Sequence, residues 1–206
     1  MTEIVYKGSI ENCTFQYIKY ASKITAKSVS TTYNIGKNLI ITLKDEKGKA
    51  INGAVISIKL ATTKNYKTDK NGQIKINIAT LTPNTYNGKI SYAGSDIFNA
   101  STGSVKVTVK KATPKITAKS ASYKLKLKTK KYTIFFKDNK NKALKNTKVS
   151  LKVNGKNYIT KTNNKGHATF KITNLNKIGT YTAIITIPTN KYYNKISKKV
   201  KIAVIF

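Results

Sequence analysis

The chain has 206 residues, of which 40 are basic and seven are acidic, so its formal net charge is +33. Every basic residue is lysine, whereas bidentate recognition of phosphate and guanine favours arginine, so the chain is poorly equipped to read a nucleic-acid sequence. A single cysteine, Cys13, excludes an intrachain disulfide and a CxxC metal or redox site. No apolar run approaches the length of about 18 residues that a membrane-spanning helix requires, so no membrane span is expected.

The first 23 residues form a segment of their own. The start, "MTEIVYKGSI", lacks the positive region and apolar run of a signal peptide, so the export and anchoring parts of a surface protein are expected outside this chain. The next phrase, "GSIENCTFQYIKYA", resembles the last coil of a right-handed parallel β-helix. One coil cannot bury its own apolar face. Residues 1–23 are therefore expected to be a β-helix remnant or a capping strand on the first domain.

From residue 24 onward the sequence is built twice. "ITAKSVS" at 24–30 returns as "ITAKSAS" at 116–122, and "KTDKNGQIKI" at 67–76 returns as "KTNNKGHATF" at 161–170. Matching segments lie 92 to 95 residues apart. Self-similarity at a nearly fixed period indicates a repeated structural unit. Two domains are predicted, at 24–112 and 113–206, as monomeric modules of a longer chain.

Both copies have the sequence pattern of short β-strands. "QIKINIA" (73–79), "SVKVTVK" (104–110) and "KVSLKV" (148–153) alternate apolar and polar residues, as strands do when one face is buried. Asn154-Gly155 predicts a type I′ hairpin, because both central positions of that turn need a positive φ. Tyr86 and Tyr181 begin the sixth strand of each copy and are expected to form tyrosine corners. About seven strands per copy predict an all-β chain of two tandem Greek-key antiparallel β-sandwiches.

Three segments carry a family resemblance: "KDEKGKAINGAVISI", "KTDKNGQIKINI" and "TYNGKISYAGSDIFNAS". They resemble the D-x-x-G, turn-plus-glycine and G-x-Y patterns of bacterial-type immunoglobulin-like repeats. Such repeats occur in adhesins and adhesin-like surface proteins, including the invasin-related kind and those of methanogenic archaea. The resemblance covers residues 24–206, although Pro188 and Thr189 stand in copy two where copy one has Ala93 and Gly94. It implies tandem immunoglobulin-like domains at the cell surface, acting as spacers and adhesive modules, and identifies no ligand.

The sequence offers little for catalysis or metal binding. Asp69, Asn71 and Gly72 look like the start of an oxygen-rich metal loop, but copy two has Asn163 in place of Asp69. Calcium requires several carboxylates, so we expect a hairpin turn between the fourth and fifth strands. No catalytic, cofactor-binding or metal-ligating residue is assigned, no cofactor is expected, and a non-enzymatic protein is predicted.

Other polar residues are expected in turns. Asp45 and Asp138 occupy matched places in the two copies and are expected to be exposed turn residues that bond their own backbone. Asp138 is the one acidic residue of copy two, which excludes a two-carboxylate hydrolase there. The one histidine, His167, is expected in a solvent-facing turn.

Two covalent modifications are considered. Some related adhesin domains carry a Lys–Asn isopeptide bond promoted by a buried acid, a role open to Asp45 or Asp138, although exposed turn positions are favoured for both. Asn12 and Asn99 each begin an Asn-x-Ser/Thr sequon, the acceptor for glycosylation in exported proteins.

The lysines are concentrated in copy two. Residues 113–206 carry 23 lysines against one acid, whereas residues 24–112 carry 14 lysines against four. The run "YKLKLKTKKY" (123–132) is predicted to place its lysines on one exposed strand face and its leucines in the core. The candidate contacts for a polyanion are Lys124, Lys126, Lys128, Lys130 and Lys131.

The expected partner is an anionic cell-wall polymer, an acidic glycan or the surface of a host or partner cell. Each lysine near an anionic surface contributes about 1 kcal/mol, and the total falls with salt. The alternatives are a basic protein that binds nucleic acid without sequence specificity and a carbohydrate-binding module.

Overall fold

The structure, a computed structural model, describes residues 4–7 and 14–206. All regular secondary structure in this part of the chain is β-strand, so none of its segments is a helix that could cross a membrane. The chain divides into two compact units, Met1–Thr31 with Gly36–Lys110 and Thr32–Ile35 with Lys111–Phe206. We call them the first and second domains. Asn12 and Cys13 lie outside the described residues.

The N-terminal segment contains two strands, β1 (Ile4–Lys7) and β2 (Thr14–Tyr17). They pair in an antiparallel manner, with Ile4 opposite Tyr17 and Lys7 opposite Thr14. This pair forms a two-stranded sheet of its own, separate from the sheets that follow.

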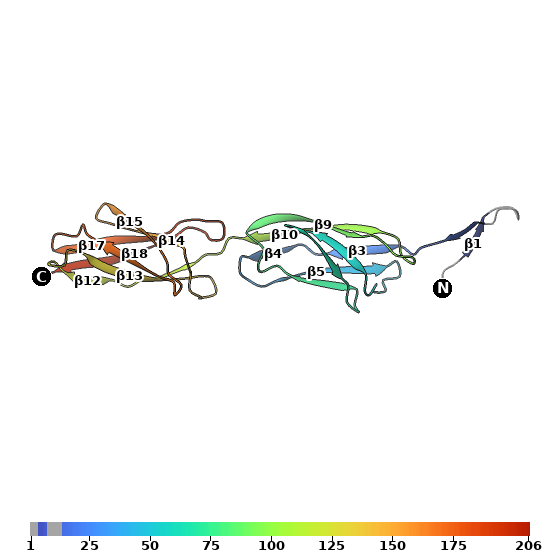
Figure 1. The fold of residues 1–206 in the computed structure, drawn as a ribbon, viewed down its shortest axis with the longest axis horizontal. Coiled ribbons are helices and arrows are strands. Elements are labelled where there is room, and N and C mark those ends of the chain that lie inside the picture. Colours follow the sequence, from blue (N-terminus) through green and yellow to red (C-terminus); the bar gives the residue numbers. More distant parts are fainter. Residues whose placement is uncertain (1–3, 8–13) are drawn as a thin grey trace. The chain divides into compact units, whose positions relative to one another are not determined.

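The first domain packs a three-stranded sheet, ordered β3-β5-β8, against a five-stranded sheet, ordered β4-β10-β9-β6-β7 (Figure 1). Aliphatic side chains from both sheets form its core. The small sheet contributes Leu39, Ile41 and Leu43, and the large sheet contributes Ile56 and Ile90. The strands are β3 (Ser22–Ala26), β4 (Val29–Thr32), β5 (Asn38–Asp45), β6 (Val55–Lys59), β7 (Thr63–Lys67), β8 (Gln73–Asn77), β9 (Asn84–Tyr92) and β10 (Ser101–Lys110).

The second domain repeats the arrangement, with sheets ordered β11-β13-β16 and β12-β18-β17-β14-β15. Phe136 and Phe170 are buried at its centre, together with Leu151, Ile172 and Ile202. The strands are β11 (Lys115–Thr117), β12 (Ala121–Lys124), β13 (Lys130–Lys137), β14 (Lys148–Val153), β15 (Lys156–Lys161), β16 (His167–Ile172), β17 (Gly179–Ile187) and β18 (Ile196–Ile205).

Apart from the β1–β2 pair, each domain has eight described strands where the sequence predicted about seven. The difference arises at the first strand, which divides into two pieces that join different sheets. In the second domain β11 pairs with β13 of the small sheet, and β12 pairs with β18 of the large sheet. The β12–β18 pair is parallel, whereas the other strand pairs of this domain are antiparallel. A strand that serves both sheets helps to close the edge of the sandwich.

Two local predictions are confirmed. Asn154 and Gly155 have φ angles of 45° and 75° and join β14 to β15, with Val153 opposite Lys156, as a type I′ hairpin requires. The Tyr86 hydroxyl donates to the Thr82 carbonyl at 2.8 Å, and the Tyr181 hydroxyl donates to the Lys177 carbonyl at 2.9 Å. In both tyrosine corners the acceptor lies four residues before the tyrosine.

The stretch "KTDKNGQIKI" forms a turn, but it is not a hairpin. It joins β7 of the large sheet to β8 of the small sheet, so the chain crosses from one layer to the other. One side-chain oxygen of Asp69 accepts hydrogen bonds from the backbone N–H groups of Asn71 and Gln73, both at 2.9 Å. Asn163 makes both equivalent bonds in the second domain. A carbonyl oxygen is therefore sufficient at this position, which accounts for the loss of the acid.

The two matched aspartates cap turns, as expected. Asp45 accepts a hydrogen bond from the Lys49 N–H at 2.8 Å, and Asp138 accepts from Lys140 and Lys142 at 2.8 and 2.9 Å. The expected exposure is wrong for Asp138, which is only 8% exposed. Its Oδ2 also accepts from the Asn34 Nδ2 at 3.1 Å, so a second segment of this domain, residues 32–35, contacts the carboxylate.

Candidate polyanion-binding surface

The predicted lysine run does not form one strand face. Lys124 ends β12, the turn residues 125–129 hold Lys126 and Lys128, and β13 begins at Lys130. Leu125 and Leu127, expected in the core, are 37% and 45% exposed. The prediction fails because the chain leaves one sheet and joins the other within this run, so the alternation of a single strand does not apply.

Lys130 is not available as a surface contact. Its side chain lies on the inward face of β13, only 3% exposed, and its Nζ donates to the Leu127 carbonyl at 2.7 Å. The neighbouring Lys131 points to the opposite side of the sheet and is exposed, because successive strand residues face opposite sides. Of the five predicted contacts, Lys124, Lys126, Lys128 and Lys131 remain exposed.

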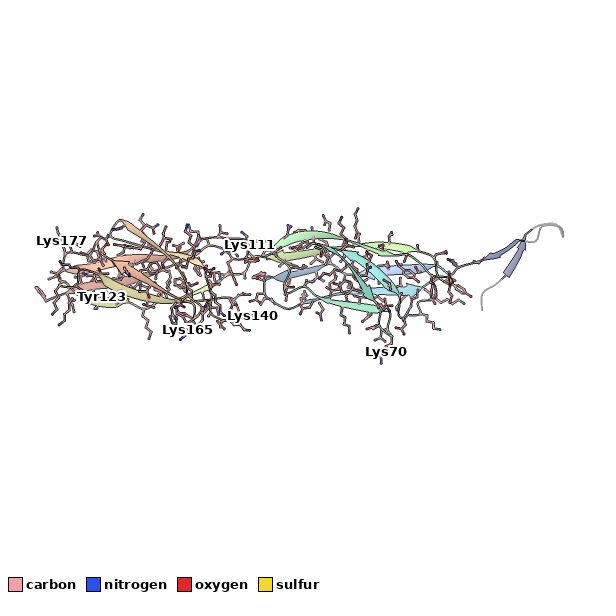
Figure 2. The ribbon with its side chains drawn as sticks, in the orientation of Figure 1. Lys70, Lys111, Tyr123, Lys140, Lys165 and Lys177 are labelled. Carbon is pink, nitrogen blue, oxygen red and sulfur yellow. The ribbon has the colours of Figure 1, made fainter. Side chains whose placement is uncertain are left out.

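The structure brings Lys131 together with lysines from other strands. On the outer side of the β11-β13-β16 sheet, Lys131 lies directly opposite Lys171, and Lys137 lies opposite Lys115. We call these four residues the lysine face. Figure 2 shows lysine side chains such as Lys165 extending away from the ribbon of this domain.

Between its two lysine pairs the lysine face carries hydroxyls and rings. The Thr133 and Thr169 Oγ1 atoms are 2.8 Å apart, and the Phe135 and His167 rings stack with centroids 4.8 Å apart. The Lys137 Nζ lies 5.0 Å from the centroid of the Phe135 ring. His167 is exposed, as expected, but it is a strand residue and not a turn residue.

The lysine face is electrostatically costly for the folded domain. Like charges directly opposite each other destabilise a sheet, and Lys131 and Lys171 are such a pair. The one acid of this domain, Asp138, is already engaged by backbone donors. An anion bound from outside would offset this repulsion.

The first domain provides an internal comparison. Asn38 lies opposite Asn77 at the position of the Lys131–Lys171 pair, and Thr42 lies opposite Gln73 at the position of the Phe135–His167 pair. The duplicated face is uncharged at these two places, but it retains the other lysine pair, as Lys23 opposite Lys44. Sequence analysis missed Lys171, which could have been found by setting the alternating segments "KYTIFFK" and "HATFK" opposite each other.

The two sequons differ in what the structure shows. Asn12 lies outside the described residues. Asn99 is exposed, and its Nδ2 donates to the Lys19 carbonyl at 3.1 Å. In the second domain Asn194 donates in the same way to the Lys111 carbonyl, at 3.4 Å. The Asn99 Nδ2 and the Asn194 Nδ2 thus each help to hold the chain that leads into their own domain.

No protein-family description and no curated protein matches the chain. Solved structures do match. Invasin, described as a bacterial integrin-binding protein, is similar over 89% of this chain and 39% of the invasin chain, at 18% identity and a TM-score of 0.55. Each domain has an immunoglobulin-like fold. The chain also matches the Yersinia pseudotuberculosis adhesin InvE over 87% of its length and 58% of that chain, at 15% identity and a TM-score of 0.43.

The match to invasin confirms the immunoglobulin-like fold of the two domains that the sequence motifs indicated. The chain spans about two fifths of the invasin chain that it matches. At such low identity the likeness concerns the fold.

Proposed function

We propose that the chain is a non-enzymatic spacer and adhesive part of a cell-surface protein, and that the lysine face binds an anionic wall polymer or acidic glycan. The observation that carries this proposal is the Lys131–Lys171 pair, two like charges held directly opposite each other without an acidic partner on that face. The fold supports this role, because the chain is similar over 89% of its length to part of invasin, a bacterial integrin-binding protein.

Two further features favour a polymer of repeated charges over a small ligand. The Lys131–Lys171 and Lys115–Lys137 pairs lie at different positions along β13, so they present ammonium groups over an extended sheet surface. Lysine is a hydrated point charge without a fixed bonding geometry, which suits a partner with a regular array of anions.

Nucleic acid is the competing partner. The missing arginine disfavours sequence-specific binding, but phosphate binding by lysine alone is physically sound. A carbohydrate-binding module is the third alternative. Tyr86, Tyr92 and Tyr132 are buried and cannot stack on a sugar, whereas other tyrosines, such as Tyr33 and Tyr192, are half-buried.

The experiment is a titration of the chain with polygalacturonate and with duplex DNA at several salt concentrations. Lys131→Gln combined with Lys171→Gln removes two charges from the lysine face. Lys199→Gln combined with Lys201→Gln removes two charges from the outer side of the β12-β18-β17-β14-β15 sheet, so the net charge of the two variants is identical.

The lysine-face variant lacks two lysines that contribute about 1 kcal/mol each, so it is expected to bind polygalacturonate about thirtyfold more weakly. The control should lose no more than about threefold. Equal losses would show that total charge and not the lysine face determines binding. Preference for DNA at physiological salt would overturn the assignment of the partner.

A further inference from the structure

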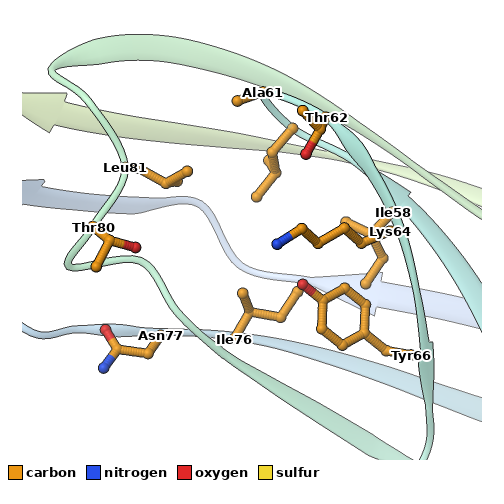
Figure 3. A pocket seen from close by; sticks show the side chains of 10 residues that line it. Ile58, Ala61, Thr62, Lys64, Tyr66, Ile76, Asn77, Thr80 and Leu81 are labelled. Carbon is orange, nitrogen blue, oxygen red and sulfur yellow. The ribbon is translucent and has the colours of Figure 1, made fainter.

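The first domain contains a pocket between its two sheets, beside the edge strand β7. Its volume is about 120 Å³. The apolar part of its wall comes from Ile58, Leu60, Ile76 and Leu81, while Lys64 and Tyr66 contribute polar groups from β7 (Figure 3). Ile58 is buried and the other three apolar residues are half-buried, so the pocket reaches down to the edge of the core.

The pocket has a positive charge at its rim, because Lys64 is an exposed residue of β7. Figure 3 shows the Lys64 side chain extending into the space beside Tyr66 and Ile76. Within the described part of the chain, neither the Lys64 Nζ nor the Tyr66 hydroxyl makes a hydrogen bond. An apolar wall beside a free ammonium group and a free phenol suits a ligand with an apolar body and an anionic group.

The second domain shows what occupies the same position when the protein itself fills it. Lys64 lies opposite Ile58 on the neighbouring strand, and in the duplicate Tyr158 lies opposite Leu151. Tyr158 packs against the core and its hydroxyl donates to the Asn174 Oδ1 at 2.8 Å. Its oxygen also accepts from the Thr173 N–H at 3.1 Å. The phenol ring of Tyr158 thereby closes the gap between the sheets.

The first domain lacks each part of this closure. Lys64 replaces Tyr158, and Thr80 stands where the second domain has Asn174. Gly88 replaces Ala183 behind the pocket, and a Cβ at Gly88 would lie 2.8 Å from the Leu60 Cδ2. Leu60 therefore adopts a position that an alanine at residue 88 would not permit.

We propose that this pocket binds a small aromatic acid. The ring takes the place that the Tyr158 ring has in the second domain, and the carboxylate lies against the Lys64 ammonium group. At about 120 Å³ the pocket is of the same order as an apolar cavity of about 150 Å³ that holds benzene, so it suits a single ring with the carboxylate left at the rim beside Lys64. The apolar wall distinguishes this pocket from the lysine face, which has no enclosed apolar space to select a ring.

The test is an amide NMR titration of the 206-residue chain with 4-hydroxybenzoate. Two analogues of similar size test the contribution of charge: 4-hydroxybenzyl alcohol is neutral and 4-hydroxybenzylamine is cationic. We expect saturating shifts confined to residues 58–66 and 76–81, with a Kd on the order of 1 mM, as befits a ligand of about ten non-hydrogen atoms. The alcohol should bind about fivefold more weakly, and the amine should not bind.

Two variants distinguish this pocket from general attraction to a basic protein. Lys64→Gln and Lys59→Gln remove the same charge from the same sheet, but the Lys59 side chain points away from the pocket. Lys64→Gln is expected to weaken binding about fivefold, and Lys59→Gln less than about twofold. Lys64→Tyr combined with Thr80→Asn copies the closure of the second domain and should abolish binding.

Each contrary result overturns the proposal. Equal weakening by Lys64→Gln and Lys59→Gln would show that the anion is held by overall charge. Shifts spread over both domains would show the same. Absence of any shift at concentrations up to about 20 mM would show that the pocket does not bind this class of ligand. Unaltered binding in the Lys64→Tyr/Thr80→Asn variant, with the amide spectrum of the rest of the chain preserved, would place the ligand elsewhere.

Discussion

The hydroxyl of Tyr181 donates a hydrogen bond to the backbone carbonyl of Lys177, four residues earlier in the chain, at 2.9 Å. Tyr86 makes the same bond to Thr82, whose side-chain Oγ1 also lies 2.9 Å from the phenol oxygen. Each bond fastens the connection before a central strand of the large sheet to the start of that strand.

Removal of these hydroxyls should destabilise the domain in which each lies. Tyr181→Phe is expected to lower the free energy of unfolding by about 1 kcal/mol. Tyr86→Phe should lower it somewhat more, because its partner Thr82 is less exposed than Lys177. Hydrogen exchange during denaturant titration reports the two domains separately. Tyr66→Phe is the control, since that hydroxyl makes no hydrogen bond within the described residues, and it should cost less than about 0.5 kcal/mol.

Two glycines with nearly the same backbone angle should respond differently to alanine. Gly155 has a φ of +75° and no atom within 4 Å of the place that a Cβ would take, so Gly155→Ala should cost about 1 kcal/mol for the left-handed backbone alone. Gly166 has a φ of +77°, and a Cβ there would lie 2.6 Å from the Phe136 carbonyl oxygen. Gly166→Ala should cost about 3 kcal/mol or more. Equal losses of stability would show that backbone angle, and not contact, sets the requirement for glycine.

Asp69 should be replaceable by asparagine, the residue that the second domain has at the matched position, Asn163, but not by alanine. Asp69→Asn retains the oxygen that accepts from Asn71 and Gln73, whereas Asp69→Ala leaves both donors without a partner, so the alanine variant should have the lower Tm. The backbone N–H of Gln73 is the main cause that lowers the pKa of the Asp69 carboxyl from its ordinary value of 3.8.

A lowered pKa means that the carboxylate stabilises the fold above its ordinary pKa and loses this effect as the pH falls through the lowered value. The advantage of wild type over Asp69→Asn should therefore be greatest near neutral pH and shrink below pH 3.8. Thermal unfolding of both proteins from pH 6 down to about pH 2 measures this difference. A difference between the two proteins that does not change with pH would contradict the lowered pKa of the Asp69 carboxyl.

Tyr193 should titrate far above an ordinary tyrosine. Burial, and after it the charge of Asp138, raises the pKa of Tyr193 to about 12. Its neutral form is thus favoured in the folded state, and this contribution to stability is complete below pH 10 and is lost as the pH rises through about 12. Phenolate absorbance of wild type minus that of Tyr193→Phe should show one tyrosine titrating near pH 12. A component near pH 10 instead would contradict the burial of this hydroxyl.

The duplication made much of the fold predictable. Asn154-Gly155 specifies its turn locally, and Tyr86 and Tyr181 occupy matched places, so each of these features followed from the sequence. The β12–β13 connection did not, because the alternation of lysine and leucine at 123–128 continues across a change of sheet that only tertiary pairing determines. Binary patterning describes one strand at a time and does not report where a strand ends.

The lysine face and the pocket were less accessible to sequence reasoning for the same reason. Lys131 and Lys171 are 40 positions apart and meet only through the register of β13 and β16. Lys64 is one lysine among many in the sequence, and its significance emerges when its place in the duplicate proves to hold the ring of Tyr158. Charge is visible in a composition, whereas the alignment of charges depends on pairing.

The parallel pairing of β12 with β18 has a mechanical consequence. Residue pairs from Ala121 with Ile202 to Lys124 with Ile205 join a strand near the beginning of the second domain to the strand at its end. When the two ends of this domain are pulled apart, these strands are loaded in shear, and the hydrogen bonds between them must break together. An antiparallel end pair would instead unzip one bond at a time. The second domain is therefore built to resist tension along the direction of its own chain.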